Sequence, residues 1–301
     1  MTPAGAPDRA APLGPVRASV AWLGERFIYA LVRLFGRVVR EVDVPWLAGP
    51  TGGAHIGDRP YEECAAREGL ALARGAASGG LVEDFGALRG PDLDPDAVDA
   101  RVRHFYEHTA GYRLDLWARS HFPARIGLWL LVTTISRKVD QLNFPLDVLE
   151  SARGLDSEIV HLRDPSGRLR YAGWYRRLAE TGRSVYTGFY TTAAPPLSPG
   201  PCVKVVFPMP NGNATVILRP QVGAGGALEL DSSGTGFGDA GFYRLQRAGG
   251  DRLRVWRVRT LREHFRVYTD AHGVLRCDHR VRFLGLPVLD LHYRMDRKPT
   301  A

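Results

Sequence analysis

The feature that most constrains the fold is the pattern of residues 146–301. Short runs rich in Val, Tyr, Phe, Trp and Thr alternate there with turn signals such as DPSGR, ETGR, PNGN and AGGD. β-branched and aromatic runs bounded by turn residues predict strands, and connections this short predict hairpins. About ten such strands favour a meandering antiparallel sheet that is closed or nearly closed into a barrel. Because no strand alternates with a long helix, the pattern argues against a parallel, Rossmann-type enzyme.

Residues 16–145 predict helices instead, which makes the expected fold class α+β. The Ala-, Pro- and Gly-rich residues 1–15 predict a disordered tail. The expected organisation is therefore a tail, a helical region over 16–145 and an antiparallel, barrel-like domain over 146–301.

Three segments of the helical region are predicted to be helices: 16–44, 60–77 and 95–119. In the first and third, apolar side chains recur at steps of three and four residues, as they do on one face of a helix. The second is composed of helix-forming residues. Asp94 before Pro95 adds a helix start signal to the third.

The most hydrophobic run of the chain is residues 126–135, IGLWLLVTTI. Its length is about half of the ~20 residues that a membrane-spanning helix needs, so we predict a buried helix, with an interfacial helix as the alternative. The N-terminus lacks the cationic start and apolar run of a secretory signal. We therefore expect a cytoplasmic protein, or one that is peripheral at the inner face of the membrane.

Composition argues against several function classes. Cys64, Cys202 and Cys277 are far apart and form no CxxC spacing, so they predict reduced, buried thiols and no zinc or redox cofactor. The net charge of +8 comes almost entirely from arginine, a bias typical of GC-rich coding sequences rather than of phosphate binding. In the arginine-rich stretch 252–266, strand alternation divides the arginines between two faces, so we expect no nucleic-acid partner.

The string HFYEH contains His104, Glu107 and His108 and fits the H-x-x-E-H signature of inverted zinc peptidases. On a helix, His104 and His108 lie one turn apart and can bind zinc while Glu107 polarises a water. A third ligand has no clear candidate because the chain beyond Pro145 predicts strands. The preferred interpretation is two histidines at a helix surface or between domains, without a metal.

Strand alternation places His279 on the apolar, inward face of its strand, together with Cys277 and Val281. His292, on the next strand, falls on the opposite, solvated face. His279 is therefore the histidine that could meet a ligand inside the sheet, and a core histidine with satisfied hydrogen bonds is the alternative.

The glycine-rich string GTGFGDAG, residues 234–241, is similar to a phosphate-binding loop. Such loops open a helix whose backbone amides face the phosphate. Here the string leads into GFYRLQ, a predicted strand. We therefore predict a wide turn or a bulge with glycine at positions of positive φ.

Four strings carry a resemblance to known families: FYEHT (105–109), FPMPNGNATV (207–216), GFGDAGFY (236–243) and LHYRM (291–295). With them the chain resembles a group of uncharacterised actinobacterial proteins over most of its length. The region from FGDAGFY to LHYRM is also similar to the C-terminal part of YndJ-type bacterial membrane proteins, whose membrane spans are not predicted here. Neither resemblance implies a catalytic residue, a cofactor or a ligand.

Three functions are compatible with this pattern. The preferred hypothesis is a binding module, in which a barrel cavity takes a lipid-like or other hydrophobic small molecule that inward polar groups such as His279 orient. The first alternative is an enzyme that acts on a small molecule at the barrel mouth, with Glu107, His108 and His279 as acid–base candidates. The second is a peripheral protein whose residues 16–44 dock on an anionic membrane through an apolar stripe and a basic flank.

Overall fold

The computed structural model describes residues 26, 29–52, 58–75, 78–121, 155–178, 182 and 184–299. Within them, fourteen strands form one sheet in which every ladder is antiparallel. The strands are β1 (Arg37–Arg40), β2 (Ala71–Arg74), β3 (Tyr112–Ser120), β4 (Leu155–Arg163), β5 (Leu169–Leu178), β6 (Ser184–Ala193), β7 (Cys202–Met209), β8 (Gly212–Val222), β9 (Leu228–Asp231), β10 (Gly241–Arg247), β11 (Arg252–Arg257), β12 (Leu261–Thr269), β13 (Leu275–Phe283) and β14 (Leu286–Arg297).

Besides the helical residues 29–35, two α-helices and several short 3-10 turns of the described chain accompany the sheet. They are α2 (Arg59–Glu68), α3 (Ala100–Glu107), η1 (Glu41–Asp43), η2 (Pro45–Leu47), η3 (Phe85–Leu88), η4 (Pro95–Ala97), η5 (Thr109–Gly111) and η7 (Ala224–Gly226).

The strands predicted from local alternation are confirmed from β4 to β14, and the predicted turn at residues 234–241 leads into β10. Period-two alternation and the turn residues are local signals, which is why they are reliable here. The α+β class with a large antiparallel sheet is confirmed as well.

The sheet branches at β8. One edge of β8 pairs with β7, while its other edge pairs with β10 over its first half and with β9 over residues 219–222. From this point one arm runs through β10 and β11 to β1, and a second runs through β9, β12, β13 and β14 to β3. The third runs from β7 through β6, β5 and β4 to β2.

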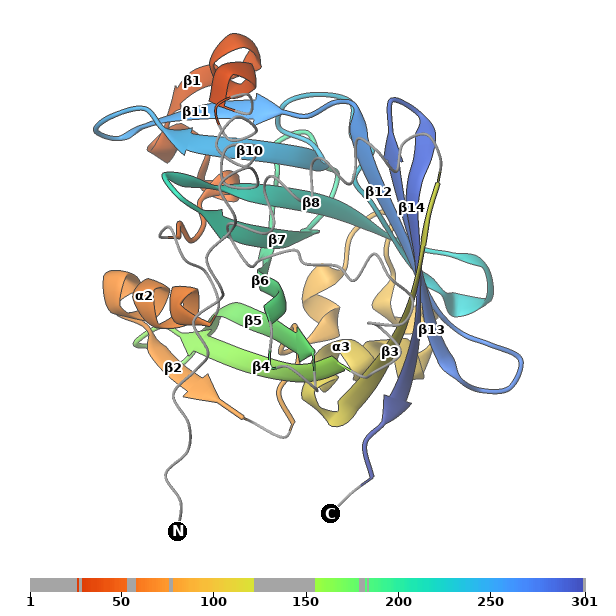
Figure 1. Ribbon diagram of the computed structural model, residues 1–301. Coiled ribbons are helices and arrows are strands. Elements are labelled where there is room, and N and C mark those ends of the chain that lie inside the picture. Colours follow the sequence, from red (N-terminus) through yellow and green to blue (C-terminus); the bar gives the residue numbers. More distant parts are fainter. Residues whose placement is uncertain are drawn as a thin grey trace.

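The predicted closure into a barrel is wrong. Figure 1 shows a curved sheet in which the upright strands β12–β14 face the transverse strands β4–β8. The end strands β2 and β3 do not pair with each other, and β3 lies beside β4 without a hydrogen-bonded ladder. Hairpins determine only which sequence neighbours pair, whereas closure needs a ladder between the first and last strands.

The helix predicted over 95–119 is wrong beyond Glu107, since α3 ends there and residues 112–120 form β3. Tyr112 and Leu116 are four residues apart, so both the helical and the strand period bring them to one face. In the structure Leu114, midway between them in the sequence, is buried as well. Burial of every second residue is the alternation of a strand. Pairing of β3 with β14 decides between the two periods.

The two other predicted helices are also shorter than expected. Gly69 ends α2 in the left-handed conformation, at φ 65°, and β2 follows where the helix was predicted to continue to residue 77. In the first segment residues 29–35 are helical, and β1 then pairs with β11. The tail 1–15 and the apolar run 126–135 lie outside the described residues.

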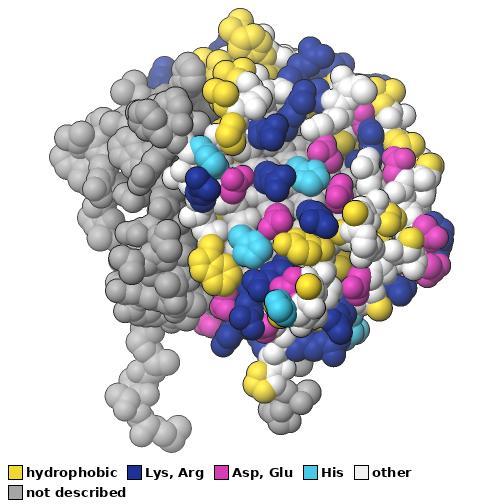
Figure 2. All heavy atoms as spheres, turned by 90° about the vertical axis from the view of Figure 1, so that its right-hand side faces the viewer, with side chains coloured by type: hydrophobic (Ala, Val, Ile, Leu, Met, Phe, Trp, Pro, Cys, Tyr) yellow, Lys and Arg dark blue, Asp and Glu magenta, His cyan; other side chains and the backbone are white. Residues whose placement is uncertain are grey.

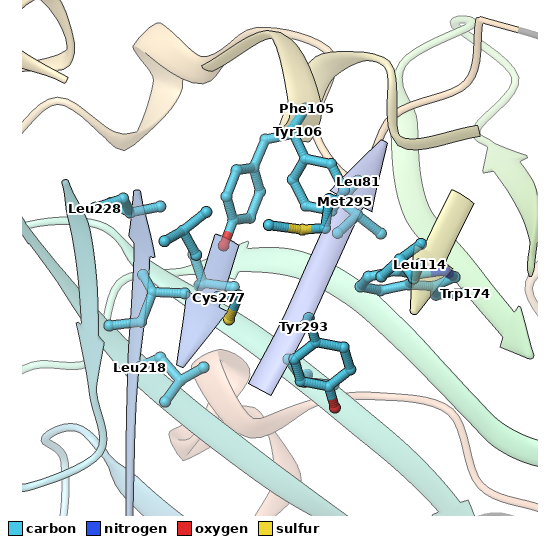
Figure 3. Close-up of a cluster of buried hydrophobic side chains, with 14 of the residues drawn as sticks. Leu81, Phe105, Tyr106, Leu114, Trp174, Leu218, Leu228, Cys277, Tyr293 and Met295 are labelled. Carbon is cyan, nitrogen blue, oxygen red and sulfur yellow. The ribbon is translucent and has the colours of Figure 1, made fainter. Parts of the chain in front are cut away.

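Curvature gives the sheet an inner and an outer face. The largest cluster of buried hydrophobic side chains lies on the inner face, where residues 81–106 cover one end of it. Figure 3 shows Phe105 and Tyr106 of α3 pointing toward Met295 and Cys277 of the sheet. Two smaller clusters lie on the outer face, one around Tyr243 and one around Tyr61 beneath α2.

The three cysteines are buried and free, as predicted. Among the residues that the structure describes, no helix combines the length and the apolar character that a bilayer span requires.

Candidate functional site

A set of polar side chains lies on the inner face of the sheet, buried or half-buried within the largest hydrophobic cluster. Charged groups are rarely buried without a partner, so such a set is a candidate site. We call it the Arg176 cluster, and it consists of Arg176 of β5, Tyr186 and Tyr190 of β6, Glu263 of β12, His279 of β13 and Tyr293 of β14.

The register of the ladders brings these residues together from distant parts of the chain. Arg176 lies directly opposite Tyr186 in the β5–β6 ladder. Tyr293 is opposite Cys277 in the β13–β14 ladder, and the Arg176 guanidinium carbon lies 5.5 Å from the centre of the Tyr293 ring. The two walls of the curved sheet therefore meet at Arg176.

Aromatic rings surround the Arg176 guanidinium. Its central carbon lies 3.6 Å from the centre of the Trp174 ring and 5.0 Å from that of Tyr186, which are cation–π distances. A hydrogen bond of 2.6 Å from Trp174 Nε1 to Ser157 Oγ holds the indole in place. The guanidinium is therefore positioned by packing.

Arg176 is 5% exposed, and its Nε has no hydrogen-bond partner. Among the described residues, no carboxylate lies within 4 Å of it. A buried charge is costly unless it is paired and hydrogen-bonded. Arg176 is thus a desolvated cation whose Nε donor is unused.

Two phenols stand beside this cation. The hydroxyls of Tyr186 and Tyr190 are 2.6 Å apart, and Gly188 between them leaves the space that Tyr186 needs, since a Cβ there would lie 2.8 Å from its hydroxyl oxygen. Burial raises the pKa of Tyr186 and Tyr190, whereas the Arg176 charge acts to lower both. Both phenols therefore stay protonated and can donate hydrogen bonds.

His279 is buried on the inner face, as predicted, and its ring stacks on Phe265 with the two centres 3.7 Å apart. Its Nε2 lies 3.4 Å from Glu263 Oε2, close enough for an ion pair but without the geometry of a hydrogen bond. The acidic neighbour of His279 is therefore Glu263, which the sequence analysis did not single out.

Cys277 lies on the same inner face as these groups, near Tyr293 (Figure 3). Burial raises its pKa to about 12, against an opposing effect of the Arg176 charge. A thiol with so high a pKa is protonated at neutral pH and is a poor nucleophile. The cluster is suited to binding an anion by a cation and phenolic donors rather than to thiolate chemistry.

The structure does not bring Glu107 and His108 to His279. Glu107 Oε1 accepts a hydrogen bond of 2.8 Å from the backbone N–H of Phe85, and His108 follows α3 with its Nδ1 3.3 Å from the Ser78 carbonyl oxygen. Glu107 therefore anchors the preceding loop to α3. In the described part of the chain, neither residue contacts His279.

His104 and His108 lie next to each other, with their ring centres 4.5 Å apart. Tyr112 OH is 2.9 Å from His104 Nδ1, and burial together with the charge of Arg297 lowers the pKa of His104. Within the described ranges, no three His, Cys, Asp or Glu side chains form a group that could hold a metal. Each histidine of the pair has a hydrogen-bond partner within the chain, Tyr112 for His104 and Ser78 for His108.

Arg176 was not predicted as a site residue, although the sequence contains a signal for it. In LRYAGWYRRL, alternation places Trp174 and Arg176 on one face and Tyr175 and Arg177 on the other. Both faces of β5 are buried, because α2 covers the outer one, so alternation alone does not tell which arginine points into the core.

Comparison with known proteins adds one likeness. Over 225 residues the chain is 26% identical to "Uncharacterized membrane protein YndJ" of Bacillus subtilis (strain 168). The match covers 71% of this chain and 37% of that protein, so the chain spans well under two thirds of its relative. No family model matches the chain, and no solved structure matches it. The likeness to YndJ-type proteins that the motifs indicated is thereby confirmed.

Proposed function

We propose that this protein binds an amphipathic small molecule that carries an acidic head group. The head group contacts Arg176 and the phenols of Tyr186 and Tyr190, and the apolar body lies along the inner face of the sheet. The acid–base alternative remains a prediction, and its best-supported residue pair is His279 with Glu263 in place of Glu107.

The observation that carries the proposal is the buried guanidinium of Arg176, which has aromatic neighbours and no carboxylate of the described chain within 4 Å. Cation–π contacts offset only about 0.5–2 kcal/mol of the cost of burying a charge. A carboxylate or phosphate on a ligand would supply charge-assisted, bidentate hydrogen bonds. Such a ligand pairs the charge that the protein leaves unpaired.

The surroundings of Arg176 suit an apolar body attached to that head group. Val205 and Phe207 of β7 and Val216 of β8 belong to the same buried cluster as Trp174. Binding sites for small hydrophobic molecules are typically apolar with a few placed polar groups. This composition favours a fatty-acid-like ligand over a sugar or a nucleotide.

The proposal predicts that Arg176→Gln weakens binding of a fluorescent long-chain carboxylic acid by about 10- to 100-fold, as expected for losing a charged hydrogen-bonding group. Arg177→Gln is the matched control, because Arg177 is the next residue and points to the other face. Titration of the full chain, monitored by quenching of tryptophan fluorescence, measures both affinities. Circular dichroism establishes that each variant is folded, and Arg176→Lys, which keeps the charge, should retain part of the affinity.

The long-chain alcohol of equal length distinguishes head-group recognition from simple partition into the core. The alcohol should bind the wild-type protein and Arg176→Gln equally weakly. If acid and alcohol bind the wild-type protein equally well, the role of Arg176 is wrong. If native mass spectrometry and titration detect no binding of either probe, the ligand-binding function itself is wrong.

A further inference from the structure

The turn between β13 and β14 exposes hydrophobic side chains. Phe283, Leu284 and Leu286 are 46%, 67% and 58% exposed, and we call residues 283–286 the hairpin tip. Leu284 and Gly285 form its two-residue turn with φ of 52° and 81°. Such turns favour Asn-Gly, and a leucine at positive φ is unusual and costly. Neither turn chemistry nor solubility explains a leucine here, so an outlier of this kind points to a function.

A polar hollow of about 120 Å³ adjoins the hairpin tip. Its lining includes Arg257, Arg259 and Arg262 together with the hydroxyl-bearing Ser232, Ser233 and Thr235. Leu261 in its wall is opposite Phe283 in the β12–β13 ladder, and the backbone N–H of Leu284 donates to the Thr260 carbonyl oxygen at 2.8 Å. The hollow and the tip are thus parts of one end of the sheet.

The hollow is positively charged. No residue that lines it is acidic, and in the described chain none of its three arginines lies within ion-pair distance of a carboxylate. The nearby Asp239 is already occupied, since its carboxylate accepts hydrogen bonds from Arg219, Thr235 and the backbone of Ala240. Arg257 donates to the carbonyl oxygens of Gly234 and Ala240, whereas Arg259 and Arg262 are exposed and leave their charges toward solvent without an acidic partner among the described residues.

Arginines also oppose one another at this end of the sheet. Arg262 of β12 lies directly opposite Arg282 of β13, and Arg280 is two residues away on the same strand face. Like charges directly across a ladder destabilise a sheet. An anionic partner would remove this repulsion.

Figure 2 views the molecule from the side of β12–β14 and shows hydrophobic side chains next to lysines and arginines along the upper margin. Below them, on the outer sheet face, acidic, basic and histidine side chains alternate, as in the 2.6 Å contact of His292 with Asp278. Exposed apolar side chains beside basic ones are thus found at the upper end.

We propose that this end of the molecule docks on an anionic phospholipid bilayer. The hairpin tip enters the interface, and the exposed Arg259 and Arg262 of the hollow meet the phosphates of the headgroups. Apolar side chains beside basic ones are the arrangement by which peripheral proteins bind such surfaces. A free phosphate ion would use the arginines but leaves the exposed Leu284 and Leu286 without a role, which is why the bilayer is favoured.

Flotation of the full chain with vesicles tests the proposal. Phosphatidylcholine vesicles containing phosphatidylglycerol should bind the protein, and pure phosphatidylcholine vesicles should bind it far less. Leu284→Asn should reduce binding about tenfold while preserving the fold, because asparagine suits the turn. The double variant Arg259→Gln/Arg262→Gln should reduce it about 30-fold and weaken its dependence on salt.

The matched controls are Leu197→Asn, which changes another exposed leucine, and Arg113→Gln/Arg168→Gln, which removes two exposed arginines elsewhere; both should bind as the wild type does. If inorganic phosphate binds the hollow while vesicles never bind, the site is for a soluble oxyanion and the proposal is overturned. If deleting residues 1–28, which leaves β1 and its ladder with β11 in place, abolishes vesicle binding and Leu284→Asn has no effect, the N-terminal segment docks instead, and the proposal is again wrong.

Discussion

At the scale of single residues, Lys204 shows how burial controls a charge. Its side chain on β7 is 5% exposed, and Nζ donates to the carbonyl oxygens of Ala48 at 2.7 Å and Trp46 at 3.3 Å. Burial lowers the pKa of Lys204 from 10.5 to about 8, helped by the charge of Arg170. These hydrogen bonds therefore attach η2 to the sheet, although burying the charged amine costs free energy.

This shift predicts a pH dependence of stability. The folded-state pKa lies below the unfolded one, so between pH 8 and 10.5 the unfolded chain holds more protons and the free energy of unfolding rises with pH. The rise amounts to about 3 kcal/mol at most. Urea unfolding across this range should show that the free energy of unfolding of the wild type rises with pH relative to that of Lys204→Met.

Lys298→Met is the control for that measurement, since Lys298 is exposed and also donates to a backbone carbonyl, that of Ala110. Its pH profile gives the effect of losing an exposed amine that bonds a backbone carbonyl, against which the Lys204→Met profile is compared. Parallel pH profiles for wild type and Lys204→Met would contradict the assigned shift.

At the scale of secondary-structure elements, the contact between α2 and β5 depends on one glycine. The Tyr61 ring of α2 is fully buried and packs on Gly173, where a Cβ would lie 2.3 Å from Tyr61 Cε1. The ring also packs against Phe189, with the two centres 4.8 Å apart. Glycine inside a strand often marks such a close approach.

We therefore expect Gly173→Ala to lower the free energy of unfolding by about 1–3 kcal/mol, the usual cost of overpacking a core. Gly236→Ala is the control, because the nearest atom to a Cβ there is Leu197 Cδ1, at an ordinary contact distance of 3.7 Å. Urea unfolding followed by circular dichroism gives both values. Equal stability of the two variants would mean that α2 does not rest on β5 as described.

At the scale of the whole molecule, the three thiols report on three different clusters of the core. Cys277 belongs to the inner cluster, Cys202 to the outer cluster around Tyr243, and Cys64 to the outer cluster beneath α2. Burial raises the pKa of Cys64 and of Cys277 to about 12 and also raises that of Cys202. Native protein should therefore react slowly with thiol reagents.

Because one sheet carries all three clusters, we expect a single cooperative unfolding transition. Three variants that each retain one cysteine, with the others changed to alanine, should gain reactivity toward a disulfide reagent at the same urea concentration. That midpoint should coincide with the loss of circular dichroism. Reaction of Cys64 at clearly lower urea than Cys277 would show that the α2 layer opens separately.

The amino-acid sequence by itself determined the strands from β4 to β14, the turn before β10 and the inward direction of His279. All three depend on residues within a few positions of each other, since side chains alternate along a strand and turn residues act locally. The motifs likewise sufficed for the likeness to YndJ-type proteins. The same alternation places Arg176 and Arg177 on opposite faces of β5. Both faces are buried, so alternation alone does not identify which of the two arginines points inward.

Only the tertiary structure decided the features that rest on distant partners. β1 and β3 exist because β11 and β14 supply ladders that outweigh a helical periodicity, and the sheet stays open because β2 and β3 find no common ladder. The same holds for the site, where Arg176 meets Tyr293 and His279 meets Glu263 rather than Glu107. Such contacts are set by the pairing register and curvature of the whole sheet, which the local periodicity of a sequence does not contain.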